Sequence, residues 1–284
     1  MIEKGTPIAV VAPCSAYTPS RLESGLQILR DRGHDPRPFP DLESTWRYLA
    51  GDDDHRAAHL IEALTSDAYG AVWIVRGGAG LGRILDRLPY AQLKPRPVIG
   101  FSDVTSLFAA LDGADDWPLI HGPVVHSLAN TDNESLDHLF DLLAGRPTPA
   151  LRGETWVSGE ASGPLVGGNL CVLGTTCGTP WQLEARGAIL MLEEIGEYAY
   201  RVDRLLQQLA SAGVFDGIAG VAVGQFSSCR VPDGADYTIK DILLDHLGRL
   251  GVPVLGNLPI GHTEANRAFP WRAPATIADG KLSW

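Results

Sequence analysis

Three polar side chains in this sequence stand where α/β proteins often place reactive groups. Ser102 follows the apolar run 98–101 and precedes a helix-like segment, Glu193 ends a second apolar run, and His262 lies in a loop after a third. A histidine activates a serine hydroxyl by taking its proton, and a carboxylate orients that histidine. Hydrolases use this chain order of serine, acid and histidine. The three residue types therefore fit nucleophilic hydrolysis.

Each of the three residues also has an ordinary structural explanation. Ser102 is able to cap the helix that follows it, with Asp103 in the first turn. Glu193 fits a solvated loop, and a lone loop histidine such as His262 is most often a surface residue. The chain has eight histidines and 34 acidic residues, so residue types alone leave many triads open.

Two other kinds of chemistry have weaker signals. The glycine-rich segment 76–82 follows an apolar run, as in nucleotide-binding modules, but the third glycine of G-x-G-x-x-G falls on Arg83 or Leu85. His55 and His59 have helical spacing for one metal, but Arg56 replaces the glutamate of H-E-x-x-H. A solvated helix face is the favoured interpretation of the histidine pair, and we expect no metal and no cofactor.

A cysteine hydrolase is a further alternative, with Cys171 or Cys177 as the nucleophile. Cys171 is expected inside a helix, which favours burial over reactivity. The four cysteines form no C-x-x-C pair and are typical of free thiols in a reducing compartment.

The elements that would position these residues alternate along the first half of the chain. Apolar runs predict buried strands, and leucines at helical spacing predict helices between them. The expected strands are 8–12, 71–75 and 97–101, and the expected helices are 20–32, 55–64 and 103–111. This alternation predicts βαβ units and a parallel sheet.

The second half is mixed. Strands are expected at 188–192 and 218–223, and helices at 200–212 and 239–250. The stretch 145–164 is rich in glycine and proline and is the candidate junction. We therefore expect an N-terminal domain over 1–145, a linker over 146–164 and a C-terminal domain over 165–284.

Bulk properties exclude some classes of partner. The formal net charge is -11, which argues against a nucleic-acid partner because phosphates need a basic face. No apolar stretch approaches the ~18 residues of a membrane span, and the first residues do not resemble a signal peptide. A cytoplasmic protein that binds no membrane is expected.

The sequence resembles the LD-carboxypeptidase family of serine peptidases, which includes murein tetrapeptide carboxypeptidases and microcin immunity peptidases. The similarity runs over nearly the whole chain in short blocks that keep the family's order. These blocks are Ile8–Pro13, Arg76–Gly78, Gly100–Asp103, His121–Pro123, Gly167–Leu170, Gly178–Thr179, Leu192–Glu194, Tyr200–Arg204, and Gly261–His262 with Asn266.

The resemblance implies roles for individual residues. Ser102 would be the nucleophile, Glu193 the orienting acid and His262 the base. The backbone N–H groups of Asp103 and Gly78 would form the oxyanion hole. Arg76 is the candidate cation for binding the substrate. Glu194 stands where many relatives have aspartate and receives no role.

The resemblance also implies an α/β fold in two parts. The N-terminal parallel-sheet domain would carry the serine, a smaller mixed α/β domain would carry the acid and the base, and the active site would lie in the interdomain cleft. The implied enzyme is a homodimeric serine carboxypeptidase that removes the terminal D-Ala of a murein tetrapeptide during cell-wall recycling. The alternatives are a peptidase that cleaves a peptide–nucleotide antibiotic of the microcin type and a non-enzymatic nucleotide-binding protein.

Overall fold

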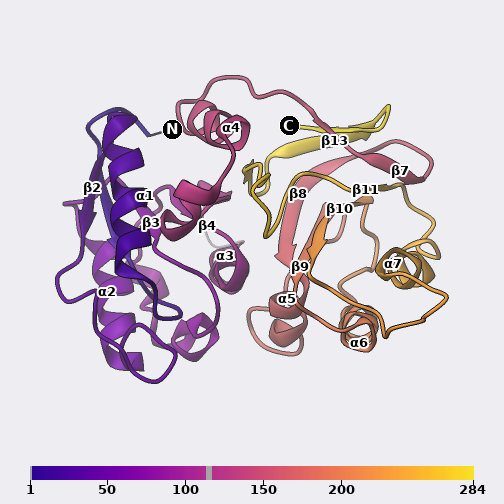
Figure 1. The fold of residues 1–284 in the computed structure, drawn as a ribbon, viewed down its shortest axis with the longest axis horizontal. Helices are drawn as coiled ribbons and strands as arrows, with labels where there is room; N and C mark the ends of the chain where they lie inside the picture. The colour runs from indigo at the N-terminus through magenta and orange to yellow at the C-terminus, as the bar shows by residue number, and fades with distance from the viewer. Residues whose placement is uncertain (1, 113–116) are drawn as a thin grey trace. The chain divides into compact units, whose positions relative to one another are not determined.

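The computed structural model describes residues 2–112 and 117–284 of the 284-residue chain. It forms two compact units, Met1–Pro147 and Thr148–Trp284. Each unit contains a β-sheet and helices that pack on it (Figure 1). The expected α/β fold, with a parallel sheet first and a mixed sheet second, is confirmed.

The sheet of the first unit is parallel, and its strands follow the order β5-β4-β3-β1-β2. These strands are β1 (Pro7–Val11), β2 (Asp35–Pro38), β3 (Ala71–Ile74), β4 (Val98–Gly100) and β5 (Leu119–His121). The helices are α1 (Pro19–Asp31), α2 (Asp53–Thr65), α3 (Thr105–Leu111) and α4 (Asn133–Leu143). Short 3₁₀ turns are η1 (Leu81–Arg83), η2 (Leu85–Arg87), η3 (Tyr90–Gln92), η4 (Ser102–Val104) and η5 (Val125–Asn130).

The apolar runs in the first half of the sequence form the central strands of this sheet, which are buried on both faces. Ile8, Val10 and Val11 of β1 are fully buried, and so is every residue of β3. The acidic run before α2 caps that helix, since the Asp52 carboxylate accepts a hydrogen bond from the His55 N–H at 2.8 Å. The buried strands therefore position the polar residues that follow them at the carboxyl edge of the sheet.

The sheet of the second unit is mixed, in the order β6-β14-β13-β8-β9-β10-β11-β7. The central strands β8 to β11 are parallel. On one side β7 pairs antiparallel with β11, and on the other β13, β14 and β6 extend the sheet from β8 in successive antiparallel pairs. Its strands are β6 (Leu151–Arg152), β7 (Glu154–Val157), β8 (Ala161–Asn169), β9 (Ile189–Ile195), β10 (Gly220–Ser227), β11 (Val254–Gly256), β13 (Pro274–Ala278) and β14 (Lys281–Ser283). The short strand β12 (Phe269–Pro270) lies outside this sheet.

Three helices accompany the second sheet: α5 (Leu170–Thr176), α6 (Ala199–Ser211) and α7 (Ile239–Leu247). They pack in sequence, α5 on α6 and α6 on α7, and form a row beside the strands (Figure 1). The expected strands and helices of both units are present, with ends that differ by a few residues. The stretch 146–164, expected as a linker, holds β6, β7 and the first residues of β8.

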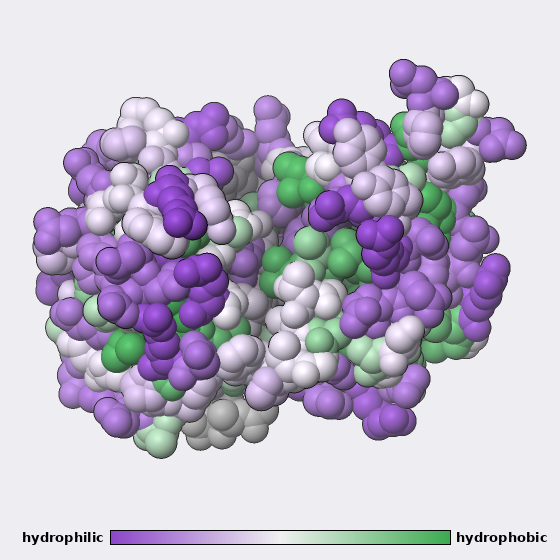
Figure 2. All heavy atoms as spheres, turned by 90° about the horizontal axis from the view of Figure 1, so that it is seen from below, coloured by the Kyte–Doolittle hydropathy of each residue, from purple (hydrophilic) through white to green (hydrophobic). Residues whose placement is uncertain are grey.

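One face of the surface is mostly hydrophilic. Figure 2 shows one face, on which hydrophilic side chains predominate and hydrophobic ones are scattered. No helix in the described part of the chain combines the length and the apolar character that a membrane crossing needs. All four cysteines, at positions 14, 171, 177 and 229, are free thiols.

Candidate active site

Ser102 lies on a sharp turn between β4 and η4. Its φ angle is 66°, in the left-handed region that a non-glycine residue seldom adopts, and Phe101 before it is extended. This conformation is that of a nucleophile elbow, which lifts a serine hydroxyl out of the end of a strand. A residue that only caps a helix does not need a positive φ. The backbone therefore favours the catalytic interpretation of Ser102 over the capping one.

A glycine lies directly against the side chain of Ser102. A Cβ atom added at Gly77 would come 2.7 Å from the Ser102 Cβ and 3.0 Å from its Oγ. The next residue, Gly78, has a φ of 99°, and a Cβ there would collide with the side chain of Ser15. The side chains of Ser102 and Ser15 thus occupy the space beside this turn, which explains why Gly77 and Gly78 carry no side chain.

Three side chains hold this glycine turn in place. The Ala79 N–H donates to the Ser15 hydroxyl at 3.0 Å, and Arg56 Nη1 donates to the Gly80 carbonyl at 2.9 Å. The Leu81 N–H donates to Asp103 Oδ2 at 2.9 Å. Burial raises the pKa of Asp103, although the hydrogen bonds from Leu81 and Cys14 and the charge of Arg56 oppose this effect. The residue after the nucleophile thus fixes the turn that faces the nucleophile.

The predicted oxyanion donors are the N–H groups of Asp103 and Gly78. Asp103 lies in the first turn of η4, next to Ser102, and Gly78 lies in the turn beside it. Across residues 2–112 and 117–284, neither N–H donates a hydrogen bond to a protein acceptor. Both donors are thus available to a ligand.

His262 and Glu193 form a close pair in the second unit. His262 Nδ1 lies 2.7 Å from Glu193 Oε2. Glu193 is fully buried near the end of β9, where it pairs in register with Asn169 of β8. Gly261 has a φ of 131°, and a Cβ there would lie 3.1 Å from Glu193 Oε2. A glycine before the histidine therefore gives the imidazole its close approach to the carboxylate.

The charges around His262 set its protonation. Burial alone would lower its pKa, but the charge of Glu193, the hydrogen bond to Glu193 and the charge of Glu194 together raise the pKa above the ordinary value. The hydrogen bond at Nδ1 places the proton of the neutral ring there and leaves Nε2 as the basic atom. The pair has the geometry of a base and its orienting acid.

Glu194, for which the sequence indicated no role, is a buried structural carboxylate. Its oxygens accept hydrogen bonds from Asn169 Nδ2 at 3.0 Å, the Cys171 N–H at 2.7 Å and the Ile195 N–H at 2.7 Å. Asn169 also caps α5 by accepting from the Val172 N–H at 3.1 Å. Burial raises the pKa of Glu194. Glu194 therefore anchors the start of α5 beside the strand that carries Glu193.

Arg76 follows β3 and is exposed. Its Nη1 donates to the carbonyl of Ala16, in the loop after β1. Arg76 has no ion pair with any residue that the structure describes. No carboxylate in the described part of the chain pairs with this cation, which directly precedes the glycine that lies against Ser102.

The other candidate groups do not assemble into a metal site. His55 and His59 of α2 lie close together, with ring centroids 4.2 Å apart. Arg56 between them is fully buried and donates to backbone carbonyls. In the described ranges, no group of three or more histidine, cysteine or acidic side chains is placed to hold a metal ion. His121 ends β5 and His126 lies in η5, so the two are on different elements.

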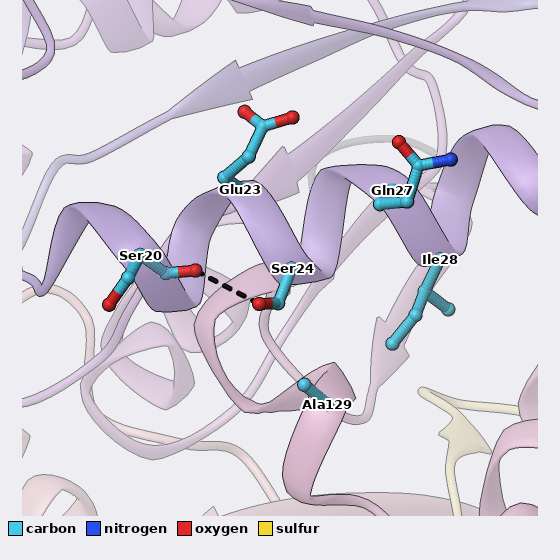
Figure 3. A pocket seen from close by; sticks show the side chains of 6 residues that line it. All are labelled: Ser20, Glu23, Ser24, Gln27, Ile28 and Ala129. Atoms are coloured by element: carbon cyan, nitrogen blue, oxygen red, sulfur yellow. Dashed lines mark hydrogen bonds between the residues drawn. The ribbon is translucent and has the colours of Figure 1, made fainter.

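An open pocket of about 640 Å³ lies along α1 (Figure 3). Its lining residues are Ser20, Glu23, Ser24, Gln27, Ile28 and Ala129. It contains none of the residues predicted to be catalytic. The first unit carries Ser102, Asp103 and Gly78, and the second carries Glu193 and His262.

Comparisons with known proteins agree on one family. The model of the LD-carboxypeptidase N-terminal domain matches residues 8–122, and that of the C-terminal domain matches residues 162–277. The murein tetrapeptide carboxypeptidase of Pseudomonas aeruginosa is 34% identical over 295 residues, which cover 98% of this chain and 94% of that protein.

Solved structures share the fold. The muramoyltetrapeptide carboxypeptidase from Oxalobacter formigenes superposes with a TM-score of 0.84 at 29% identity and covers 98% of this chain and 97% of its own. The wild-type microcin C7 self immunity protein MccF gives a TM-score of 0.88 at 20% identity, covering 99% and 96% of the two chains. This last likeness shows the fold alone.

Proposed function

This chain belongs to the LD-carboxypeptidase family, and we propose that it is a serine peptidase with Ser102, Glu193 and His262 as its catalytic triad. Two observations, one in each unit, support the proposal: Ser102 has a strained φ of 66°, and buried Glu193 lies 2.7 Å from His262. Each half is a specialised arrangement that structural roles alone do not require.

The proposed reaction follows from these groups. His262 Nε2 takes the proton of Ser102 as its Oγ attacks the scissile carbonyl carbon, and Glu193 stabilises the imidazolium through Nδ1. The N–H groups of Asp103 and Gly78 stabilise the tetrahedral oxyanion. His262 then protonates the leaving amine, and an acyl-enzyme forms. Water, deprotonated by His262, hydrolyses that ester and restores the serine.

The proposed substrate is a murein tetrapeptide, from which the enzyme releases the terminal D-Ala. Support comes from the Pseudomonas aeruginosa relative, which bears the name murein tetrapeptide carboxypeptidase and aligns over nearly the full length of both chains. The four free thiols fit a reducing compartment, so we place this reaction in the cytoplasm. We also propose a homodimer, which sedimentation of the purified protein would test.

The triad is tested with single and double variants on an L,D-peptide. Ser102→Ala and His262→Ala should each lower kcat by about 10⁴-fold or more, and the double variant should cost little beyond either single one, because triad members act as a unit. Unchanged thermal unfolding of the variants is the control. Wild-type turnover by Ser102→Ala would exclude it as the nucleophile.

The substrate is tested by offering the purified enzyme a murein tetrapeptide and an aminoacyl-sulfamoyl adenylate. Release of D-Ala from the tetrapeptide, with the adenylate left intact, supports a role in cell-wall recycling. Cleavage of the adenylate alone would replace the proposed substrate by a peptide–nucleotide antibiotic of the microcin type and leave the triad standing.

A further inference from the structure

Two observations relate Arg76 to the proposed nucleophile. Its chain neighbour Gly77 touches Ser102, since a Cβ added there would lie 3.0 Å from the serine Oγ. Burial raises the pKa of the Cys14 thiol, which hydrogen-bonds to Asp103, and the charge of Arg76 acts on that thiol in the opposite direction. Arg76 is therefore next in sequence to a residue that contacts Ser102, and its charge acts on a thiol that hydrogen-bonds to Asp103, the residue after Ser102.

His126 is attached to the same stretch of backbone as Arg76. Arg76 donates to the carbonyl of Ala16, and the Thr18 N–H donates to His126 Nε2 at 3.4 Å. The His126 N–H in turn donates at 2.9 Å to the carbonyl of Val75, the residue before Arg76. These three bonds place His126 and Arg76 beside one another around the loop 16–18.

Arg21 lies at the start of α1, the helix that follows this loop, and α1 packs on η5, which carries His126. The Arg21 N–H donates to the Thr18 carbonyl at 3.1 Å. Burial lowers the pKa of His126, and the charges of Arg76 and Arg21 lower it further. Both arginines are exposed, and within residues 2–112 and 117–284 neither forms an ion pair.

The two arginines lie on a chain whose formal net charge is -11. Several other exposed arginines of this unit have carboxylate partners, as in Arg32–Asp137 at 2.7 Å and Arg83–Asp53 at 2.6 Å. Guanidinium groups match the geometry of a carboxylate, and their hydrogen bonds to it are charge-assisted. A ligand carboxylate would therefore be a suitable partner for these two guanidinium groups.

We propose that Arg76 and Arg21, together with His126, form the subsite for the terminal carboxylate of the substrate. The assignment rests on the proposed carboxypeptidase function, because only an exopeptidase must recognise that group. It adds Arg21 and His126, from α1 and η5, to a site otherwise defined by the ends of β3 and β4. Recognition by paired cations favours peptides with a free C-terminus over amides and esters.

The test compares N-acetyl-L-lysyl-D-alanine with its C-terminal amide. Arg21→Ala should raise KM for the acid on the order of tenfold, with little change in kcat, because a charge-assisted contact is lost in binding. KM for the amide should stay the same. Arg76→Ala should act in the same direction, and Arg76→Lys should recover part of the loss. Arg30→Ala on the same helix, where Arg30 pairs with Glu23, is the matched control.

Calorimetric binding separates this inference from the proposed reaction. In a Ser102→Ala background, the acid should bind more tightly than the amide, and adding Arg21→Ala should remove that difference. This measurement needs no turnover, so it tests the subsite even if the wild-type enzyme cleaves no L,D-peptide. Equal losses for acid and amide, or no loss for the acid in either arginine variant, would overturn the subsite.

Discussion

Ser102 and Gly77 show how two residues far apart in sequence determine one reactive atom. The positive φ of Ser102 costs conformational energy, so surrounding contacts must maintain it. Gly77 contributes by having no side chain, which leaves room for the serine Cβ and Oγ. The glycine is needed here for a close approach rather than for a left-handed backbone.

Gly77→Ala should lower kcat/KM by about 100-fold, because the new methyl group would force the serine away by a distance on the order of 1 Å. The measurement is steady-state cleavage of an L,D-peptide. Gly82→Ala in the same segment is the control, since a Cβ there meets nothing within 4 Å. Equal activities of the two variants would show that Gly77 does not set the position of the nucleophile.

The pKa of His262 gives a second prediction at this scale. The base acts when neutral, so kcat/KM should rise with pH through a pKa above the ordinary 6.5. Glu193→Gln removes the largest effect that raises this pKa, so the inflection should move to lower pH. The maximal rate should also fall, by about 10³-fold or more. Glu194→Gln should shift the inflection in the same direction by less.

The same shift has a consequence for stability. Because the folded pKa of His262 is raised, its protonated form stabilises the fold at pH below the unfolded value, and this contribution disappears as pH rises through the folded pKa. Thermal unfolding of wild type and Glu193→Gln across this range checks the sign. In the kinetic measurement, a pH profile of kcat/KM whose inflection stays at the same pH in Glu193→Gln would contradict the assignment of His262 as the titrating base.

At the scale of elements, the glycine turn after β3 depends on buried Arg56. Its guanidinium donates to the Pro13 and Gly80 carbonyls and pairs with Asp53, and its side chain is fully buried. Arg56 thereby joins the loop after β1, the turn after β3 and the start of α2. This explains why an arginine stands between His55 and His59, where a metal site would be opposed.

Arg56→Ala should lower the free energy of unfolding by about 3 kcal/mol or more, since it leaves a carboxylate and two carbonyls without their buried partner. Arg83→Ala removes an exposed partner of the same Asp53 and should cost less than about 1 kcal/mol. Denaturant unfolding measures both. Similar losses of unfolding free energy in the two variants would show that the burial of Arg56 does not increase its contribution to stability.

The elements that the sequence predicted are those with a strong apolar pattern. The strands β1 and β3 and the first part of β9, residues 189–192, are continuous runs of apolar residues and were identified. β2 was missed because it has prolines at positions 36 and 38. β8 was missed because glycines interrupt it, and one of them, Gly167, is required for close packing, since a Cβ there would collide with the Met191 backbone.

The candidate site was predictable in part. A serine after an apolar strand is visible in the sequence, but its φ is not, because it depends on tertiary packing. The contact of His262 with Glu193 spans 69 residues, and only the family resemblance indicated it. Arg21 and His126 were not predicted as a basic cluster, since they lie 105 positions apart on α1 and η5 and carry no motif.

At the scale of the whole molecule, a net charge of -11 repels an anionic peptide, whereas the proposed subsite of Arg76 and Arg21 attracts it. The two effects differ in range. The Debye length is about 30 Å at about 0.01 M salt and about 8 Å at about 0.15 M, so salt removes the long-range repulsion first. Contacts within a binding site are screened much less. The whole-chain field should therefore dominate the encounter at low salt and the local cations should dominate at physiological salt.

Raising the salt concentration from about 0.01 M to about 0.15 M should increase kcat/KM for an anionic murein tetrapeptide several-fold, because the repulsive field of the chain is screened. A peptide with no net charge should show little change and is the control. Arg21→Ala should respond to salt more steeply than wild type, since it loses the opposing local attraction. The measurement is initial rate at low substrate concentration over a salt series. A fall in kcat/KM with salt for the anionic peptide would contradict this prediction. It would show that attraction by the local cations, and not repulsion by the overall charge, dominates the encounter even at low ionic strength.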